Sequence, residues 1–460
     1  MTEINVRSTI TAYLHQDVST APLALLRVLF GCVVTISCIR FMMLGWIDAQ
    51  YVKPSIHFPY QGFEWVVSLG SPGMYVLYSV MTAGAIGIML GAWYRASSVM
   101  FLLCFTYIEL IDKTYYLNHY YFVTLIALLL CCAPAHRAFS VDVWRNPELR
   151  SERAPRWMLD IFKLQVGIVY FYAGVAKITS SWLIDAMPLR IWLPAQSDVA
   201  VIGPLMTLWW LPWVFAWAGM VFDISTPFLL SWKQTRLVAY IAVVVFHVIT
   251  SMLFQIGVFP LLMIVMALVF FSDKVAREHD LKVAREHALA PARHTVAPIR
   301  HTVAPILHTV AREHALSLPA LIFFFIFQIL LPLRYMLYPG ELMWTEEGYR
   351  FSWRVMLMEK TGVATFTVED RTSGRKGVVD NALFLNALQE RQMSTQPDMI
   401  LQYAHFLHDH YASAGMHDPL VTAEVWVTLN GAPSALLVDP ARDLSREELG
   451  LHRNEWVLAR

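Results

Sequence analysis

Nine apolar stretches of membrane-spanning length dominate this 460-residue sequence and constrain its fold more than any other feature. They lie near residues 22–44, 73–93, 97–112, 119–135, 157–179, 208–230, 237–254, 256–272 and 318–337. A helix needs about 20 apolar residues to cross the hydrocarbon core of a bilayer. The chain is 57% hydrophobic and only 15% charged, which is more apolar surface than a water-soluble fold buries. The sequence therefore predicts an α-helical polytopic membrane protein with about nine transmembrane helices.

The distribution of lysine and arginine predicts the orientation of these helices. The basic residues of the predicted inner segments are Arg7, Arg95, Arg137, Arg145, Arg150, Arg153, Arg156, Lys233 and Arg236. Because positively charged loops stay on the cytoplasmic side, the chain after Pro339 is expected outside, in a bacterial periplasm or an equivalent lumen. This orientation requires two helices at 237–254 and 256–272, where Gly257 and Pro260 interrupt the apolar run. One bent helix there would place the tail inside.

The predicted inner loop at 274–316 is repetitive, with three copies of VAREH and two of HTVAP. Its histidines could suggest metal binding. Tandem copies spread histidines along the chain without closing a coordination shell, so we interpret the loop as a solvated insertion. We expect no metal site in this protein.

After Pro339 the composition becomes that of a water-soluble domain. Alternating patterns predict strands at FSWRVMLM (351–358) and VATFTVED (363–370), followed by a hairpin connection at DRTSGR. Residues 381–414 are expected to form one or two helices, and EVWVTLNGAPSALLVDP two strands around Asn430 and Gly431. The chain is thus divided into a transmembrane domain, 1–338, and a small C-terminal α+β domain, 339–460.

Four polar residues in or beside the apolar stretches are the candidate site. Lys177 ends the segment VYFYAGVAKITSSW (169–182), where loss of hydration favours the neutral, basic form of a primary amine. Asn118 and His119 open the fourth stretch at its outer end, and His247 lies in the outer half of the seventh. Antiparallel helices would bring these groups to one depth. Each alone also has a structural explanation: a lysine that reaches the headgroup layer, a histidine in a helix–helix contact, or an asparagine cap.

A neutral lysine paired with histidine in an apolar cavity suits the deprotonation of a lipid-soluble weak acid such as a quinol or phenol. The sequence contains no G-x-S-x-G, no HExxH, no Walker loop, no glycine-rich dinucleotide motif and no CxxC pair. We therefore expect no nucleotide cofactor. The formal net charge of zero provides no basic field for a nucleic acid.

Five segments resemble the vitamin K-dependent gamma-glutamyl carboxylase family, whose bacterial members share an HTTM-type transmembrane domain. In chain order they are IDKTYYLNHYYF, FYAGVAKI with SSW, FHVITSMLFQIGVFP, LYPGELMWTEEGYRFSWRVM, and EVWVTLNG with LLVDP. The resemblance implies a multi-pass membrane lyase that oxygenates reduced vitamin K to the epoxide with O2 and couples this to the carboxylation of a glutamate by CO2. It implies a lipid-soluble quinone, a glutamate-containing peptide or protein, and membrane lipids as partners.

The resemblance also implies roles for individual residues. Lys177 matches the lysine that deprotonates the quinol, and His119 with Asn118 matches the pair beside it. Gly174, within the AGVAKI segment, and His247 are assigned to the same cofactor site. Residues that match positions near the glutamate site are Trp344, Tyr349, Ser352 and Trp353.

The sequence also departs from the family pattern. Ala176 stands where the animal enzymes have the first of two adjacent lysines, and Glu346, Glu347 and Arg350 replace uncharged residues. The long lumenal region of the animal enzymes is expected to be largely absent. Two alternative functions follow: a quinol epoxidase that does not carboxylate protein, and a non-enzymatic transport or lipid-binding protein.

Overall fold

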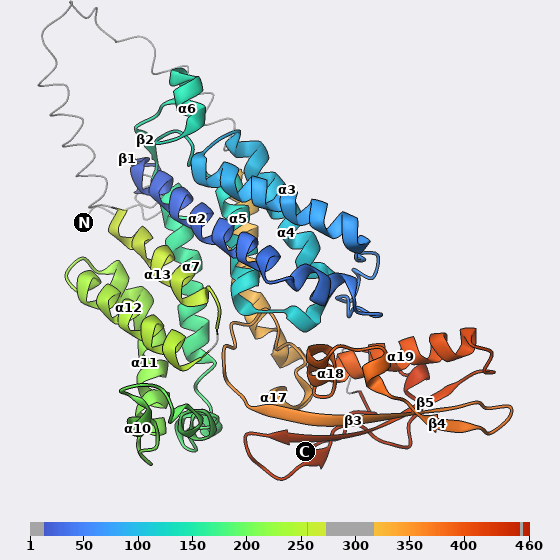
Figure 1. Cartoon of the computed structure of the whole chain (residues 1–460). Coiled ribbons are helices and arrows are strands. Elements are labelled where there is room, and N and C mark those ends of the chain that lie inside the picture. The colour runs from blue at the N-terminus through green and yellow to red at the C-terminus, as the bar shows by residue number, and fades with distance from the viewer. Residues whose placement is uncertain (1–12, 255, 273–316, 451–453) are drawn as a thin grey trace, which may run out of the picture.

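The computed structural model of the protein describes residues 13–254, 256–272, 317–450 and 454–460. A bundle of long helices forms most of the molecule, and a small α+β domain lies at one end of it (Figure 1). The repetitive segment predicted at 274–316 lies outside the described residues.

Within the described residues, seven helical segments are long and apolar enough to cross a membrane. They are α2 (Ala21–Met43), α3 (Gly70–Leu90), α4 (Tyr94–Ile111), α7 (Trp157–Val175), α11 (Leu211–Ser231), α12 (Arg236–Leu253), and Pro319–Leu337, which joins α16 (Ser317–Leu330) to η6 (Leu331–Leu337). Two shorter apolar helices fall on the other two predicted stretches. One is α5 (Asn118–Cys132), and the other is Phe259–Phe271, which combines α13 (Phe259–Ala267) with η5 (Leu268–Phe271). The predicted fold class is confirmed, and the predicted number of nine is approximate because these two helices are short.

A buried arginine shows how the bundle satisfies polar groups at the end of a span. The side chain of Arg27 on α2 is fully buried, and Nη1 donates to the carbonyls of Ile88 (3.0 Å) and Met89 (3.1 Å). These carbonyls belong to the last turn of α3, where helical hydrogen bonding runs out and the N–H of Gly91 reaches the carbonyl of Ile88. A cation at this end of a helix is also favoured by the helix dipole. Arg27 therefore joins α2 to the end of α3.

The break between α12 and α13 decides the topology of the last spans. Gly257 has a φ of +61°, a conformation that favours glycine, and α13 begins at Phe259 and packs back against α12. The apolar run at 237–272 is therefore two helices, as the predicted orientation requires.

The C-terminal domain contains a four-stranded sheet in the order β4-β3-β5-β6. Its strands are β3 (Lys360–Glu369), β4 (Lys376–Val378), β5 (Leu420–Leu429) and β6 (Ala435–Leu436), all paired antiparallel. The buried side chains alternate along β3 and β5, and α19 (Pro397–Ser413) contributes to the same hydrophobic core as these strands. The predicted strands at 363–370 and around Asn430, and the helices at 381–414, are confirmed.

The predicted strand at 351–358 is wrong. Residues 351–353 form a turn and residues 354–358 are irregular with a bend at Met356, because Phe351, Trp353 and Met356 have positive φ angles of 62°, 59° and 53°. Hydrophobic alternation alone cannot reveal such backbone angles, which L-residues rarely adopt.

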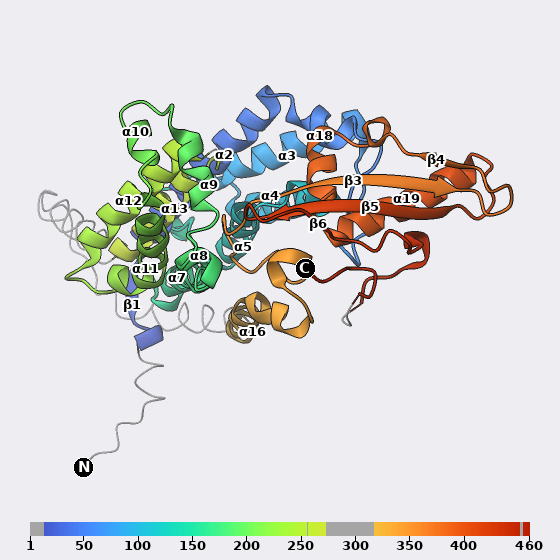
Figure 2. The same ribbon diagram turned by 90° about the horizontal axis from the view of Figure 1, so that it is seen from below.

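The C-terminal domain packs against loops that the sequence places on the outer side. Gln389, on α18 (Ala387–Met393), donates from Nε2 to the carbonyl of Ile56 (2.8 Å) and to Oδ2 of Asp112 (3.0 Å). Gln402 on α19 donates to the carbonyl of Pro59 (3.0 Å). The tail and the connections α2–α3 and α4–α5 therefore lie at the same end of the bundle. Seen from below, the sheet lies toward α2–α5, with α10–α13 on the other side (Figure 2).

The connection between α7 and α11, residues 176–210, also lies at this end, and we call it the cap. It contains α8 (Ser180–Leu183), α9 (Leu189–Trp192), η4 (Pro194–Gln196) and α10 (Gly203–Met206). Trp182 donates to the carbonyl of Ala216 on α11 (2.9 Å), and Asn430 of the C-terminal domain donates to Oγ of Ser181 (2.9 Å). The cap therefore bridges the bundle and the C-terminal domain.

Candidate active site

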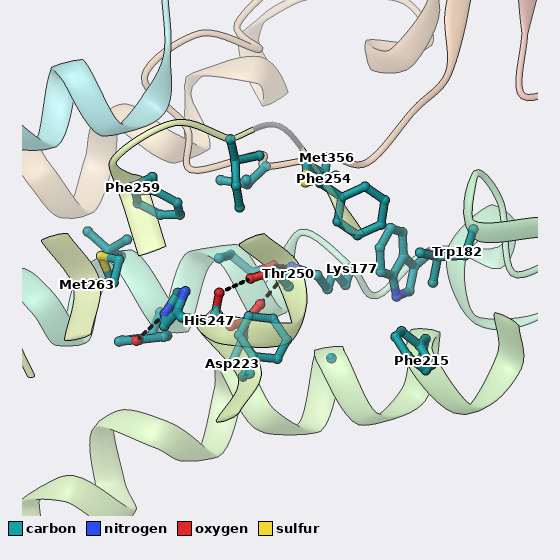
Figure 3. A pocket seen from close by; sticks show the side chains of 18 of the residues that line it. Lys177, Trp182, Phe215, Asp223, His247, Thr250, Phe254, Phe259, Met263 and Met356 are labelled. Carbon is teal, nitrogen blue, oxygen red and sulfur yellow. Dashed lines mark hydrogen bonds and ion pairs between the residues drawn. The ribbon is translucent and has the colours of Figure 1, made fainter. Parts of the chain in front are cut away.

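An apolar cavity, which we call the main cavity, lies among α7, α11, α12 and α13 beneath the cap (Figure 3). Its empty volume is about 830 Å³, including open space at its mouth. The side chains around it are mostly aromatic or aliphatic. They are Val169, Tyr170, Ala173, Lys177, Trp182, Leu189, Trp192, Phe215, Asp223, Phe246, His247, Thr250, Phe254, Ile256, Phe259, Met263, Val355 and Met356, and Gly219 adds backbone.

Lys177 lies at the wall of this cavity, two residues after the end of α7. Its Nζ donates to Oδ2 of Asp223 on α11 (2.7 Å) and to the carbonyl of Ala173 (3.1 Å), and both charged side chains are buried. The expected imidazole partner of Lys177 is therefore corrected to a carboxylate. The sequence analysis missed Asp223, although a carboxylate within an apolar span is itself a signal of function.

Gly174 explains why α7 and α11 can approach closely enough to form this pair. A Cβ at this position would lie 2.5 Å from Cγ1 of Ile224 and 2.7 Å from its backbone nitrogen, which is shorter than any real carbon contact. Gly174 does not line the cavity. It lies next to Asp223 and Ile224, where the absence of a side chain lets the two helices approach.

His247 lines the same cavity from α12. One ring nitrogen, Nε2, is hydrogen-bonded to the hydroxyl of Tyr170 at 2.9 Å, and the other, Nδ1, is buried without a hydrogen-bond partner in the described part of the chain. Figure 3 shows this ring toward the Phe259 and Met263 side of the cavity, with Lys177 and Trp182 at the opposite side. The cavity thus has a polar group on each side and apolar walls between them.

The other two predicted polar residues lie outside the main cavity. His119 is buried behind Phe259, whose ring stacks on the imidazole at a centroid distance of 5.5 Å. Asn118 donates from Nδ2 to the carbonyl of Arg354 (3.1 Å) and accepts from the hydroxyl of Tyr116 (3.0 Å). The structure therefore brings together Lys177 and His247, and it places His119 one ring away from them.

Of the four residues matched to the glutamate site, Trp344, Ser352 and Trp353 are buried and Tyr349 is half-buried, and none of them lines the main cavity. Trp344, on α17 (Leu342–Thr345), donates to the carbonyl of Leu458 (2.9 Å), and Ser352 donates to the carbonyl of Tyr349. Trp353 stacks on Tyr121 of α5 at 5.0 Å. The residues that do reach the cavity follow directly after Trp353 and Arg354, namely Val355 and Met356.

The fold and this cavity define an integral membrane protein of many helices with a buried lysine–carboxylate pair facing an apolar chamber. The HTTM domain family matches residues 15–274, and the vitamin K-dependent gamma-carboxylase lumenal domain matches residues 313–460. The chain therefore belongs to the gamma-glutamyl carboxylase family, as the sequence segments predicted. No solved structure was found to match it.

Proposed function

We propose that the protein is an integral-membrane, vitamin K-dependent gamma-glutamyl carboxylase-like enzyme. It would oxygenate a reduced naphthoquinone with O2 to the epoxide and add CO2 to a glutamate. The observation that carries the proposal is the buried pair of Lys177 and Asp223 at the wall of an apolar cavity. When bound, reduced vitamin K would supply the strong base that removes the γ proton of glutamate. The cavity suits such a ring, because its walls are apolar and its few polar groups lie on two sides.

Lys177 is the proposed base. A proton can shift along the 2.7 Å contact from the ammonium group of Lys177 to the carboxylate of Asp223, which leaves a neutral amine without any proton leaving the site. Rotation about the Cε–Nζ bond would then turn the nitrogen lone pair from Asp223 toward the cavity. Two neutral groups are less costly to bury than two ions, so the dry surroundings favour this shift. The amine can then accept the hydroxyl proton of a quinol. The apolar walls exclude water, which would otherwise quench a strong base.

The remaining predicted residues have supporting roles in this proposal. His247, fixed by Tyr170, would contact the far oxygen of the ring, and Gly174 lets Asp223 reach Lys177. His119 would act from behind Phe259, and Asn118 would hold the segment that carries Val355 and Met356 against α5. The residues that shape this segment are Trp344, Tyr349, Ser352 and Trp353, which we assign to the glutamate side.

The proposed location is a bacterial inner membrane with the C-terminal domain in the periplasm. The distribution of basic residues supports this orientation, and so does the packing of the domain against the predicted outer loops. We propose the boundary between the membrane domain, 1–338, and the C-terminal domain, 339–460, on the same grounds.

The test is turnover by purified wild-type and Lys177→Ala protein with reduced vitamin K, O2, labelled bicarbonate and a glutamate peptide. We expect Lys177→Ala to lose epoxide formation by about 10²–10⁴-fold, the usual contribution of a general base. A small exogenous amine should restore part of it. The matched control is Lys163→Ala on the same helix, where the lysine is paired with Asp160 at 3.1 Å and lies outside the cavity. Wild-type turnover by Lys177→Ala would refute the proposal.

One observation favours a second function, quinol epoxidation without carboxylation of protein. Glu346 and Glu347 follow Trp344 in the segment matched to the glutamate site, and carboxylates there would repel a glutamate substrate. Glu346 is neutralised by Lys360 at 2.9 Å, whereas Glu347 accepts a hydrogen bond from the neutral amide of Asn454. Burial raises the pKa of Glu347, which weakens this repulsion. In the assay above, epoxide without fixed label would support the second function.

A further inference from the structure

A second, smaller cavity lies next to the main cavity, with Phe259 between them. Phe259 lines the main cavity, stacks on His119 at 5.5 Å, and meets the ring of His247 edge-on at 6.0 Å. The second cavity has a volume of about 330 Å³ including its opening. Its lining comes from α2, α4, α5, α13 and the residue before α13: Val33, Val34, Ser37, Cys38, Phe105, His119, Tyr120, Val123, Val258 and Leu262.

Three polar groups face this second cavity without a hydrogen-bond partner within the described residues. They are the imidazole of His119 and the hydroxyls of Ser37 and Tyr120. The side chain of His119 is only 8% exposed, so bulk water does not satisfy it. His119 is buried, whereas Ser37 and Tyr120 are half-buried and line the same space. A polar group without a partner is costly at membrane depth. The cavity is therefore suited to a small ligand that accepts or donates hydrogen bonds.

We propose that the second cavity binds carbon dioxide, the co-substrate of the proposed carboxylation, and this inference rests on that proposed function. The oxygens of carbon dioxide can accept hydrogen bonds from Ser37 and Tyr120, and its carbon can face the imidazole of His119. Bicarbonate does not suit the site, because none of the ten lining residues is a lysine or arginine that could balance a buried anion. Molecular oxygen is apolar, so three hydrogen-bonding groups would add nothing to its binding free energy. Carbon dioxide held here lies one aromatic ring from the main cavity.

The direct test is infrared spectroscopy of the full-length protein in lipid nanodiscs with ¹³CO2, since bound carbon dioxide gives a narrow stretching band distinct from the dissolved gas. We expect this band in the wild type and its loss in Val123→Phe, which fills the second cavity. Ser37→Ala, which removes one donor, should weaken binding about fivefold, as expected for a single hydrogen bond. The matched control is Gly219→Leu, which fills the main cavity instead and should keep the band.

The absence of a bound band in the wild type would overturn the proposal, and so would a band that Val123→Phe leaves unchanged. Either result would mean that the cavity holds water or nothing. Because Val123→Phe could disturb packing, Ser37→Ala provides the second variant. The readout does not depend on turnover, so it separates failure of this inference from failure of the proposed function. In turnover, Ser37→Ala should raise the CO2 concentration for half-maximal label fixation about fivefold, and saturating CO2 should restore the label.

Discussion

Oδ2 of Asp223 lies 2.7 Å from Nζ of Lys177, and the pair is buried where α7 and α11 meet the main cavity. Each charge in this pair is matched by the other in surroundings that offer little water. Either partner alone would be an uncompensated ion in an apolar wall, which is the most costly arrangement for a buried charge. The chemistry we assign to Lys177 therefore depends on Asp223.

Asp223→Asn should abolish most quinol epoxidation although Lys177 is still present. The amide cannot take up the proton of the Lys177 ammonium group, so this proton would have to leave the site before the amine could act as a base. We expect a loss of about 10²–10⁴-fold, similar to that of Lys177→Ala, and the double variant should be no worse than either single variant, because the two residues act as a unit. Asp160→Asn on α7, outside the cavity, is the control. Independent, multiplying losses in the double variant would contradict the relay.

Gly174→Ala should separate α7 from α11 and thereby lower both stability and activity. The new methyl carbon would lie 2.5 Å from Cγ1 of Ile224 and 2.7 Å from a backbone nitrogen that cannot move aside. Overpacking of this kind costs about 1–3 kcal/mol of the free energy of unfolding. The unfolding temperature in detergent measures the effect on stability, and the rate of epoxide formation measures the effect on activity.

The control for that variant lies on the same helix. At Gly167 an added Cβ would make an ordinary contact of 3.5 Å with Pro227. Gly167→Ala should therefore keep or raise the unfolding temperature, since alanine is the better helix former. Equal destabilisation by both substitutions would show that the close approach at Gly174 is not the cause.

The helices were predictable from the sequence because membrane-spanning length and apolar composition are local properties of the chain. The direction in which each side chain points from its helix axis was not predictable from the sequence. Lys177 and His247 were expected at one depth and do share a cavity, but His119, at a similar expected depth, is turned behind Phe259. Helix rotation is set by packing, through contacts such as that of Gly174 with Ile224, and a single sequence does not reveal it.

The errors at the C-terminal side have a different origin. The alternation in residues 351–358 indicated a strand, yet three positive φ angles turn this segment so that Val355 and Met356 face the cavity. Asp223, in the middle of α11, belongs to none of the family segments, but it is a charged residue within an apolar span. A search for any charged residue within an apolar span would have found it.

Gly219→Leu should block the main cavity without harming the fold. Gly219 lines the cavity from α11, and a Cβ added there would meet no atom within 4 Å. Replacing a helical glycine with leucine should also stabilise α11 by up to about 1 kcal/mol. We therefore expect quinol binding, measured by quenching of tryptophan fluorescence, to be lost while the unfolding temperature is kept or raised. Unchanged quinol affinity would exclude this cavity as the quinol site.

The contact between the C-terminal domain and the outer loops includes a partly buried ionic cluster around Asp398. Its Oδ2 lies 2.7 Å from Nζ of Lys113 in the α4–α5 connection and 2.7 Å from Nη1 of Arg350. Asp398→Asn would leave the buried Lys113 and the half-buried Arg350 without their carboxylate, which should cost about 1–3 kcal/mol of the free energy of unfolding at pH 7. Glu152→Gln, in an exposed pair with Arg150, should cost far less.

The same cluster predicts how the difference in unfolding free energy between the wild type and Asp398→Asn depends on pH. Burial alone would favour the protonated form of Asp398, but Arg350 and Lys113 outweigh it and hold its pKa well below the ordinary value. The stabilisation is then complete above the unfolded pKa of about 4, and it is lost as the pH falls toward the lower folded pKa. Wild type and Asp398→Asn should therefore differ most above pH 4 and converge in stronger acid. Unfolding followed by the fluorescence of the buried Trp344 and Trp456 measures this, and a difference that grows on acidification would contradict the assignment.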